Sequence, residues 1–414
     1  MRRHVARPRP SMRLVPGVAP LEVRLLPSTD VLTYHGDNTR SGWDPTETAL
    51  TPADVTPSSF GKLFNMPVDG RVDAQPLYVA GVNIPGQGVH NVVYIATEND
   101  SVYAFDADNG VRLWRVSVLP AGEALYNRPQ GPPGGLVGIM DTPVIDAATG
   151  TMYLVAASQS AGATPIVHQR LNALSIATGA DVVPARSIDQ SITYPGAGPG
   201  GNGTDEIFDP GQYKERDALL LAGGVVYTSW SSNYDTAPYT GWVIGYRASD
   251  LGLASVLNID PAGQPTSSLL DDGSGNAFWN SGDGPAADAA ENLYNISANG
   301  PFDPNLDAAG FPANGDYGDS ILKMTPSPGA LTVTDYFTPA DQQLLANEDF
   351  DLGSSGIALA DEPGPGGTIE HLAIGSDKQG DVFVVDRDAM GEFHASGDAI
   401  LQELPGALGS ALFG

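Results

Sequence analysis

The distribution of apolar and polar residues along the chain predicts short β-strands joined by tight turns. The clearest stretch is 92–115, VVYIATENDSVYAFDADNGVRLWR, in which apolar residues alternate with other residues over short runs. Alternation with a period of two is typical of β-strands. Asp108-Asn109-Gly110 supplies residues that tolerate the left-handed backbone conformation of a short hairpin. The stretch therefore predicts three strands connected by two turns.

The same order of strands and turns recurs along the chain, in units of about 70 residues. Each unit ends on a hairpin glycine, namely Gly110, Gly179, Gly252, Gly329 and Gly391. Each unit also begins with a further short strand, at 74–79, 141–146, 217–221, 284–288 and 356–359. Four short strands per unit, repeated radially, are typical of a β-propeller. We therefore predict an all-β fold, a β-propeller of four-stranded blades at approximately 59–118, 136–188, 215–260, 278–338 and 352–404.

The pattern accounts for about five blades, whereas rings of this kind close with roughly seven or eight. Residues 31–58 are expected to form a lead-in, and residues 406–414 resemble the opening strand of a further blade. We therefore expect a C-terminally truncated, incomplete ring with an unpaired edge on the last blade. Residues 60–68 would be the strand that latches such a ring by joining its final blade.

Composition narrows the classes of function. Of the 414 residues 41% are hydrophobic, and the 50 glycines and 34 prolines lie between apolar runs, as expected for many turns. The formal net charge of −29 repels phosphate backbones, so no nucleic-acid partner is expected. The chain has no cysteine, which excludes disulfides, thiolate metal sites and cysteine nucleophiles. No apolar run is long enough for a transmembrane segment.

The N-terminal 30 residues are expected to be a disordered export segment. They contain six arginines, but no apolar stretch of an ordinary signal peptide follows them. Residues 21–28, LEVRLLPS, resemble the L-E-x-R-x-L-x-S box found near the start of many large extracellular bacterial proteins. This resemblance implies an extracellular or cell-surface location.

The repeat itself resembles a known family. Residues 104–114, AFDADNGVRLW, are similar to the repeat signature of pyrroloquinoline quinone (PQQ) propellers, roughly A-x-D-x-x-x-G-x-x-x-W. The match is strong in the first blade and degenerate later, where Ser175 or Lys323 replaces the aspartate. The resemblance covers about residues 59–414 and implies a member of the quinoprotein alcohol dehydrogenase-like superfamily.

That resemblance implies a site on the propeller axis that holds PQQ and Ca²⁺ or a lanthanide ion. Residues 296–303, ISANGPFD, resemble the family's T-G-N-P-x-P-W-N segment, whose asparagine binds the metal, and this places Asn299 as a ligand. Residues 348–353, EDFDLG, resemble the family's T-P-x-D-E-W-D segment, which places Asp351 as the general base and a further metal ligand. PQQ and Ca²⁺ are therefore the cofactors that the resemblance implies.

Two departures from the family pattern weaken that mapping. The glutamate expected among the metal ligands would lie near Val137, where no glutamate is present, and the family's cysteine pair is absent. A second candidate calcium site is formed by Asp303, Asn305 and Asp307, whose oxygens at alternate positions resemble a calcium loop. This loop lacks a bidentate glutamate, which Asp316 or Asp319 could replace if the loop folds back. The alternative for both segments is an ordinary acidic loop.

We therefore hypothesise an exported propeller that serves as a non-catalytic binding or scaffold module for a cell-surface protein or polysaccharide. The alternative is a PQQ- and Ca²⁺-dependent dehydrogenase that oxidises an alcohol or a polymer hydroxyl, with Asn299 and Asp351 in its site. A third possibility is a periplasmic assembly factor that scaffolds outer-membrane insertion, against which the missing lipoprotein cysteine argues. The sequence names no substrate or partner.

Overall fold

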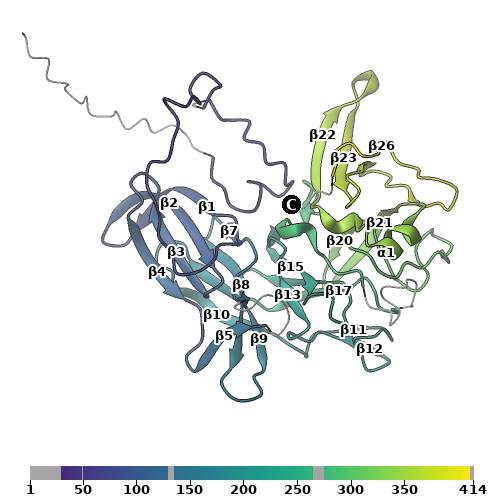
Figure 1. Cartoon of the computed structure of the whole chain (residues 1–414), viewed down its shortest axis with the longest axis horizontal. Helices are drawn as coiled ribbons and strands as arrows, with labels where there is room; N and C mark the ends of the chain where they lie inside the picture. Colours follow the sequence, from purple (N-terminus) through teal and green to yellow (C-terminus); the bar gives the residue numbers. More distant parts are fainter. Residues whose placement is uncertain (1–28, 49, 129–134, 264–274, 411–414) are drawn as a thin grey trace, which may run out of the picture.

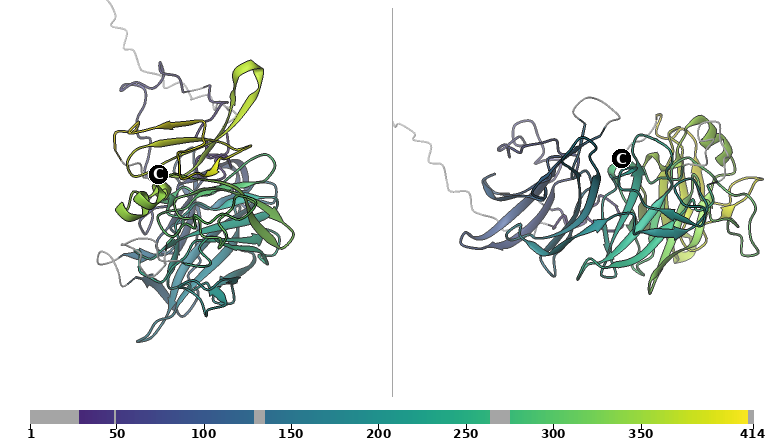
Figure 2. Two further views of the ribbon diagram at one scale, coloured as in Figure 1. Left: turned by 90° about the vertical axis from the view of Figure 1, so that its right-hand side faces the viewer. Right: turned by 90° about the horizontal axis from the view of Figure 1, so that it is seen from below.

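The computed structural model describes residues 29–410, apart from residues 49, 129–134 and 264–274. Within this part of the chain five sheets of four or more strands follow one another, together with one two-stranded sheet. Figure 1 shows these sheets as a fan around a common centre, and in Figure 2 successive sheets stand face to face. The predicted all-β propeller fold is confirmed. The predicted export segment lies outside the described residues except for Thr29 and Asp30.

Each of the five larger sheets, here called blades 1 to 5, contains four antiparallel strands that follow one another in chain order from the inside outward. The innermost strands of blades 2 to 5 lie beside one another near the centre. The quartets are β1 (Leu77–Ile84), β2 (Gly88–Thr97), β3 (Ser101–Asp106) and β4 (Arg112–Ser117); β7 (Val144–Asp146), β8 (Thr151–Ser160), β9 (Val167–Ser175) and β10 (Asp181–Ile188); β14 (Leu220–Ala222), β15 (Val225–Ser232), β16 (Trp242–Arg247) and β17 (Leu253–Asn258); β18 (Ala286–Ala287), β19 (Leu293–Ile296), β20 (Ile321–Ser327) and β21 (Ala330–Thr338); and β22 (Ala358–Pro363), β23 (Ile369–Ser376), β24 (Val382–Asp386) and β26 (Gln402–Leu404).

Short elements extend or connect the blades. β25 runs parallel to β21, so that a segment following β24 joins the preceding blade. The described residues contain one α-helix, α1, which lies between blades 4 and 5 in the sequence. These connecting elements are β5 (Glu123–Asn127), β6 (Leu136–Val137), β11 (Thr193–Pro195), β12 (Asp205–Ile207), β13 (Tyr213–Glu215), β25 (Glu392–Phe393), α1 (Gln342–Glu348) and the 3₁₀ turns η1 (Asn280–Gly282), η2 (Leu352–Ser354) and η3 (Pro365–Gly367).

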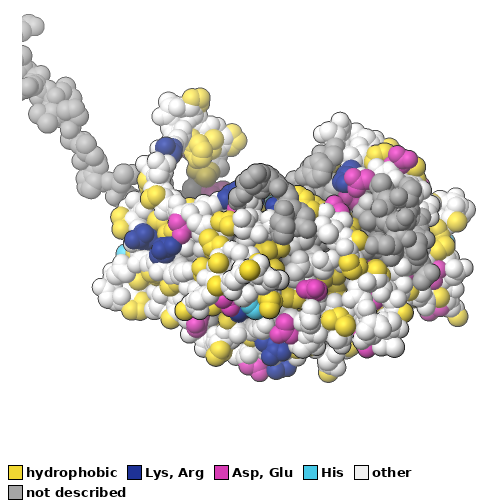
Figure 3. Space-filling model, turned by 60° about the horizontal axis from the view of Figure 1, so that its bottom comes forward, with side chains coloured by type: hydrophobic (Ala, Val, Ile, Leu, Met, Phe, Trp, Pro, Cys, Tyr) yellow, Lys and Arg dark blue, Asp and Glu magenta, His cyan; other side chains and the backbone are white. Residues whose placement is uncertain are grey.

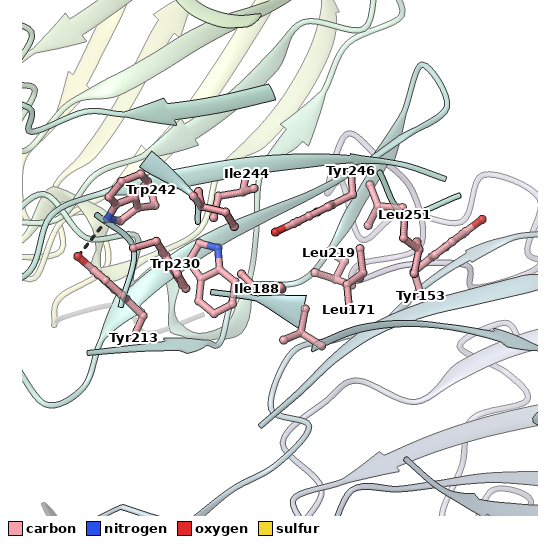
Figure 4. Close-up of a cluster of buried hydrophobic side chains, with 14 of the residues drawn as sticks. Tyr153, Leu171, Ile188, Tyr213, Leu219, Trp230, Trp242, Ile244, Tyr246 and Leu251 are labelled. Carbon is pink, nitrogen blue, oxygen red and sulfur yellow. Dashed lines mark hydrogen bonds between the residues drawn. The ribbon is translucent and has the colours of Figure 1, made fainter. Parts of the chain in front are cut away.

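The blades are held together by apolar side chains that interdigitate between neighbouring sheets. Figure 4 shows the cluster between blades 2 and 3, where Trp230 and Trp242 are completely buried. The Trp242 indole N–H donates to the Tyr213 hydroxyl at 3.0 Å, which satisfies the polar atom of a buried tryptophan. Strands β8 and β15 are buried on both faces over most of their length, whereas β24 alternates between buried and half-buried residues. The middle blades are therefore covered on both sides and blade 5 on one.

The hairpin glycines behave mostly as the sequence predicts. Gly110 has φ 73°, and its N–H donates to the Asp106 carbonyl at 2.8 Å, which closes the turn between β3 and β4. Blade 3 differs, because Leu251 with φ 55° takes the left-handed conformation that was expected of Gly252. The turn is the same, but the strained position lies one residue earlier.

Neither of the two predicted end strands is present in the part of the chain that the structure describes. Residues 60–68 contain no strand, and Phe64 packs instead against Gly110 at the β3–β4 turn. Residues 406–410 form turns whose Leu408 N–H donates to the Gly380 carbonyl, and the preceding β26 pairs with β24 as the outer strand of blade 5. Residues 411–414 lie outside the described residues.

Residues Val31–Arg40, here called the axial strap, contact the inner strands of all five blades. The sequence predicted residues 31–58 as a lead-in to the propeller. Val31 forms a β-bridge with Tyr78 of β1. Later residues of the strap form at least one hydrogen bond with each of blades 2 to 5. These bonds join the Leu32 carbonyl to Ile145 N–H at 2.8 Å, Asn38 Nδ2 to the Leu221 carbonyl at 2.8 Å, the Asn38 carbonyl to Ala287 N–H at 2.7 Å and the Thr39 carbonyl to Leu359 N–H at 2.8 Å.

Arg40 ends the strap with a guanidinium group that is completely buried at the centre of the fan. Its Nη2 donates to the Leu219 carbonyl at 3.1 Å and its Nε to the Pro285 carbonyl at 3.1 Å, so it joins blades 3 and 4. Its Nη1 donates to Thr33 Oγ1 at 2.6 Å within the strap. Asp283 lies 3.9 Å away and balances its charge. A buried guanidinium is tolerated only with such complete pairing.

We expect Arg40→Met to destabilise the fold by about 3–5 kcal/mol, because the backbone carbonyls and the Asp283 carboxylate that Arg40 pairs with are left buried without a partner. Denaturant unfolding of both proteins measures this difference. Arg247→Met is the matched control, because that side chain is half exposed and its ion pair with Asp250 contributes about 0–1 kcal/mol. Equal denaturant midpoints of unfolding for Arg40→Met and the unsubstituted protein would show that Arg40 does not stabilise the fold in this way.

Candidate functional site

Three buried carboxyl groups occupy equivalent positions around the centre of the fan. Asp141, Asp217 and Asp283 each lie three residues before the inner strand of blades 2, 3 and 4, and all are buried. In blades 1 and 5 the equivalent positions are Ala74 and Ser355. The propeller repeat therefore brings three acids, here called the axial carboxylates, toward the Arg40 end of the strap.

The axial carboxylates are only partly paired. Asp217 Oδ2 accepts hydrogen bonds from Ser229 Oγ at 2.6 Å and Asn280 Nδ2 at 2.8 Å, but its Oδ1 has no partner. Burial raises the pKa of Asp141 and of Asp217 to about 8. Burial also raises the pKa of Asp283, to about 6, and the positive charge of Arg40 opposes that rise. Burial thus favours the neutral form of these acids in the fold.

A basic–aromatic cluster lies in the same part of the propeller. The rings of Tyr234 and Trp279 are flanked by three cationic side chains. Arg128 lies over Tyr234 with its Cζ 4.1 Å from the ring centre, and Lys214 Nζ is 5.1 Å from both ring centres. Arg216 lies over Trp279 at 5.3 Å. These distances are those of cation–π contacts.

Acidic side chains, Asp73 and Asp235 among them, lie near the cluster, but one of its cations has donors without a partner. Arg128 donates from Nη2 to the Tyr234 hydroxyl at 2.8 Å, but its buried Nε and Nη1 have no partner. Burial, followed by the positive charges of Arg216 and Arg128, lowers the pKa of Lys214 to about 8. On the face drawn in Figure 3, basic side chains form only a few small groups among acidic and neutral ones.

Asp351 and Asn299, which the sequence placed in one site, are in direct contact. The Asn299 backbone N–H donates to Asp351 Oδ1 at 2.9 Å, and Lys378 Nζ lies 2.7 Å from Asp351 Oδ2. Lys378 Nζ also pairs with Asp349 Oδ1 at 2.9 Å, which in turn accepts the Asn299 side-chain N–H at 3.3 Å. Burial raises the pKa of Asp351, and the Lys378 ammonium opposes that rise. We call these four residues the Asp351 centre.

The basic–aromatic cluster and the Asp351 centre are connected through two short 3₁₀ turns. Trp279 precedes η1, and Asp351 precedes η2. The two turns contact each other, and Ser281 Oγ donates to the Ser354 carbonyl at 2.8 Å. The two groups of residues therefore form adjacent parts of one candidate site.

The second predicted calcium loop uses its acidic side chains to hold its own backbone. Asp303 Oδ1 accepts the backbone and side-chain N–H groups of Asn305, and Asp307 Oδ1 accepts the N–H groups of Ala309 and Phe311. The loop does fold back, because Asn314 N–H donates to Asp303 Oδ2 and Asn314 Nδ2 donates to Asp316 Oδ2. Asp319 points elsewhere and accepts hydrogen bonds from Leu352 N–H and Gln342 Nε2.

The donor set for a divalent cation does not fit. Among the described residues no group of three or more His, Asp or Glu side chains is arranged to hold a metal ion. Val137, at the position where a glutamate ligand was expected, is buried in an apolar cluster with Tyr126 and Met140. Both oxygens of Asp351 already bind Asn299 N–H and the Lys378 ammonium. The unpartnered donors of Arg128 beside Tyr234, in contrast, are of the kind that pairs with a carboxylate.

Comparison with known proteins identifies the fold. No family model and no curated protein matches the chain. Among solved structures it is similar to the quinohemoprotein alcohol dehydrogenase ADHIIG from Pseudomonas putida HK5, with 17% identity and a TM-score of 0.58 over 91% of this chain and 48% of that one. It is equally similar to quinohemoprotein alcohol dehydrogenase from Comamonas testosteroni, with 17% identity and a TM-score of 0.58 over 92% and 52% of the two chains.

These similarities show that the chain has the propeller fold of the quinoprotein alcohol dehydrogenases. At 17% identity they define the fold alone, and the chain spans about half the length of either structure. The predicted resemblance to PQQ propellers is thus supported at the level of the fold. No helix among the described residues is both long and apolar enough to cross a membrane.

Sequence reasoning missed the cations of the site. Trp279, which no motif singled out, is half-buried beneath Lys214 and Arg216. Lys378 was not considered. The axial carboxylates had a usable signal, because each aspartate precedes its inner strand by the same three residues. The cation cluster had no motif, since Lys214 and Arg216 lie in and beside β13 whereas Arg128 follows β5, far away in the sequence.

The raised pKa values of the axial carboxylates predict a stability that falls as pH rises. An unfolded aspartate has a pKa of about 3.9, so between pH 4 and pH 8 the folded chain binds more protons than the unfolded chain. We therefore expect the thermal midpoint to be highest near pH 5 and to decrease toward pH 8. Asp217→Asn should flatten this slope, whereas Asp181→Asn, at an exposed position, should leave it unchanged. A midpoint that rises from pH 5 to pH 8 contradicts the assignment.

Proposed function

We propose that this propeller is a binding module whose basic–aromatic cluster takes a planar organic polyanion, with PQQ as the ligand that the fold suggests. The observation that carries the proposal is the convergence of Arg128, Lys214 and Arg216 on Tyr234 and Trp279, with two buried nitrogens of Arg128 unpartnered. Buried donors without a partner are rare in proteins, and a carboxylate ligand would satisfy them.

The chemistry of the cluster favours a flat anion over a flexible one. An aromatic plate can stack on the exposed part of the Trp279 ring, while carboxylates at its rim reach the guanidinium groups. PQQ has both features, since it is a fused aromatic quinone that bears carboxylates. An anionic ligand also stabilises the protonated form of Lys214, whose own pKa is about 8. Binding should therefore weaken above pH 8, where free Lys214 is neutral.

We further propose that the binding module serves as an exported scaffold. The resemblance of residues 21–28 to an export box motivates an extracellular or cell-surface location. A cell-surface protein or polysaccharide remains the proposed partner. In this role the site binds an organic anion and catalyses no reaction of it.

The test is a titration of the protein with PQQ at pH 7, followed by quenching of tryptophan fluorescence and by the absorbance of the quinone. We expect saturable binding of one PQQ, with affinity reduced about tenfold or more in Arg128→Gln because a charge-assisted pair is lost. Trp279→Leu should weaken binding as well.

Arg112→Gln is the matched control for this titration. Arg112 is exposed on β4 and takes no part in the cluster, so its replacement should leave the affinity for PQQ unchanged. Absence of binding, or equal losses in Arg112→Gln and Arg128→Gln, would remove the proposal, because a general effect of charge would then explain the result.

The contact between Asn299 and Asp351 favours a second candidate function, a quinone-dependent dehydrogenase that oxidises an alcohol or a polymer hydroxyl. Bound PQQ would supply an electron-accepting quinone. The Asp351 carboxylate would take the hydroxyl proton of the substrate, a role for which a buried carboxyl with a raised pKa is suited.

This second candidate is tested by dye reduction with PQQ, Ca²⁺ and a panel of alcohols. If the chain is a dehydrogenase, Asp351→Asn should abolish dye reduction while retaining the affinity for PQQ. Binding of PQQ without dye reduction by the unsubstituted protein leaves the binding module as the function.

A further inference from the structure

The Asp351 centre differs from a metal site because a cationic side chain already pairs with the carboxylate oxygens that would have to bind a metal ion. Lys378 Nζ contacts two carboxylates at once, Asp351 Oδ2 at 2.7 Å and Asp349 Oδ1 at 2.9 Å. The Lys378 side chain is about three-quarters buried and that of Asp351 is almost completely buried. One ammonium therefore bridges the centre's two acids, of which Asp351 is buried and Asp349 is about half exposed.

The local backbone fixes this arrangement. Asp349 ends α1 in the left-handed conformation with φ 59°, which turns the chain toward Asp351. The Lys378 N–H donates to the carbonyl of Phe350, the residue between the two acids, at 3.1 Å. Lys378 is therefore anchored to this turn by both its backbone and its side chain. These contacts fix the position of the ammonium group beside the two acids.

The remaining donors cannot hold a divalent cation beside that ammonium. Asn299 N–H occupies Asp351 Oδ1, and no group of three or more His, Asp or Glu side chains among the described residues is arranged to hold a metal ion. A divalent ion bound to Asp351 would lie close to the Lys378 ammonium in a poorly hydrated site, where like charges repel strongly.

We infer that Lys378 takes the place of the metal ion, so that the site binds its ligand without Ca²⁺ or a lanthanide. This inference deepens the proposed function, on which it rests for the identity of the ligand. It also assigns Lys378 a positioning role, which is to hold the carboxylates of Asp351 and Asp349 together beside the basic–aromatic cluster.

The inference makes an unusual prediction, that removal of a cationic residue creates a metal site. Lys378→Met frees the carboxylates of Asp349 and Asp351 as hard oxygen donors. We expect Ca²⁺ affinity at this centre, measured by calorimetry in 0.15 M salt and by Tb³⁺ luminescence, to increase at least tenfold. Lys378→Arg keeps the charge and should behave like the unsubstituted protein. The double variant Asp351→Asn with Lys378→Met should lose the gain.

Two results overturn the inference. One is stoichiometric Ca²⁺ or Tb³⁺ binding by the unsubstituted protein that Asp351→Asn abolishes, and the other is a Lys378→Met protein that binds metal no better than its parent. Circular dichroism and the thermal midpoint establish that each variant is folded, and Lys62→Met at an exposed position controls for the loss of one positive charge. Titration of the same proteins with PQQ in the absence of metal tests the proposed binding function separately.

Discussion

The structure depends on one constraint, which is that a charged group can be buried at the centre of the fan only if each of its donors is paired. Arg40 satisfies this condition with carbonyl groups of blades 3 and 4, a hydroxyl of its own strap and the nearby carboxylate of Asp283. Because those partners come from different blades, the guanidinium group fixes the blades relative to one another. The backbone of the strap extends the same constraint to blades 1, 2 and 5.

The candidate site follows from this central packing. A propeller brings equivalent positions of successive blades together, and here those positions carry acids in three blades and the neutral residues Ala74 and Ser355 in the other two. Polar groups near such an axis are poorly hydrated, which is why the axial carboxylates have raised pKa values and Lys214 a lowered one. Arg128 in the basic–aromatic cluster and the Lys378 ion pair are two responses to the same low hydration. One leaves donors unpaired for a ligand, and the other pairs them internally.

Much of the fold could be predicted from the sequence, and less of the site. Strand alternation and hairpin residues such as Asp108 and Gly110 are local signals, so the blades could be found without any tertiary information. The strap could not, because the partners of Arg40 lie about 180 and 245 residues away and no local pattern specifies them. Asn299 and Asp351 were found together because short motifs surround both. Arg128, Lys214 and Lys378 have no motif, and only the fold brings them to the site.

The central claim, that the strap couples the blades into one unit, is tested most directly by native-state hydrogen exchange. The amides of Ile145, Ala287 and Leu359 donate to the strap from three different blades. The account predicts that these three amides exchange with one common free energy and that this value falls equally at all three in Arg40→Met. Three different free energies, with only the amide nearest to Arg40 affected by the substitution, would contradict it.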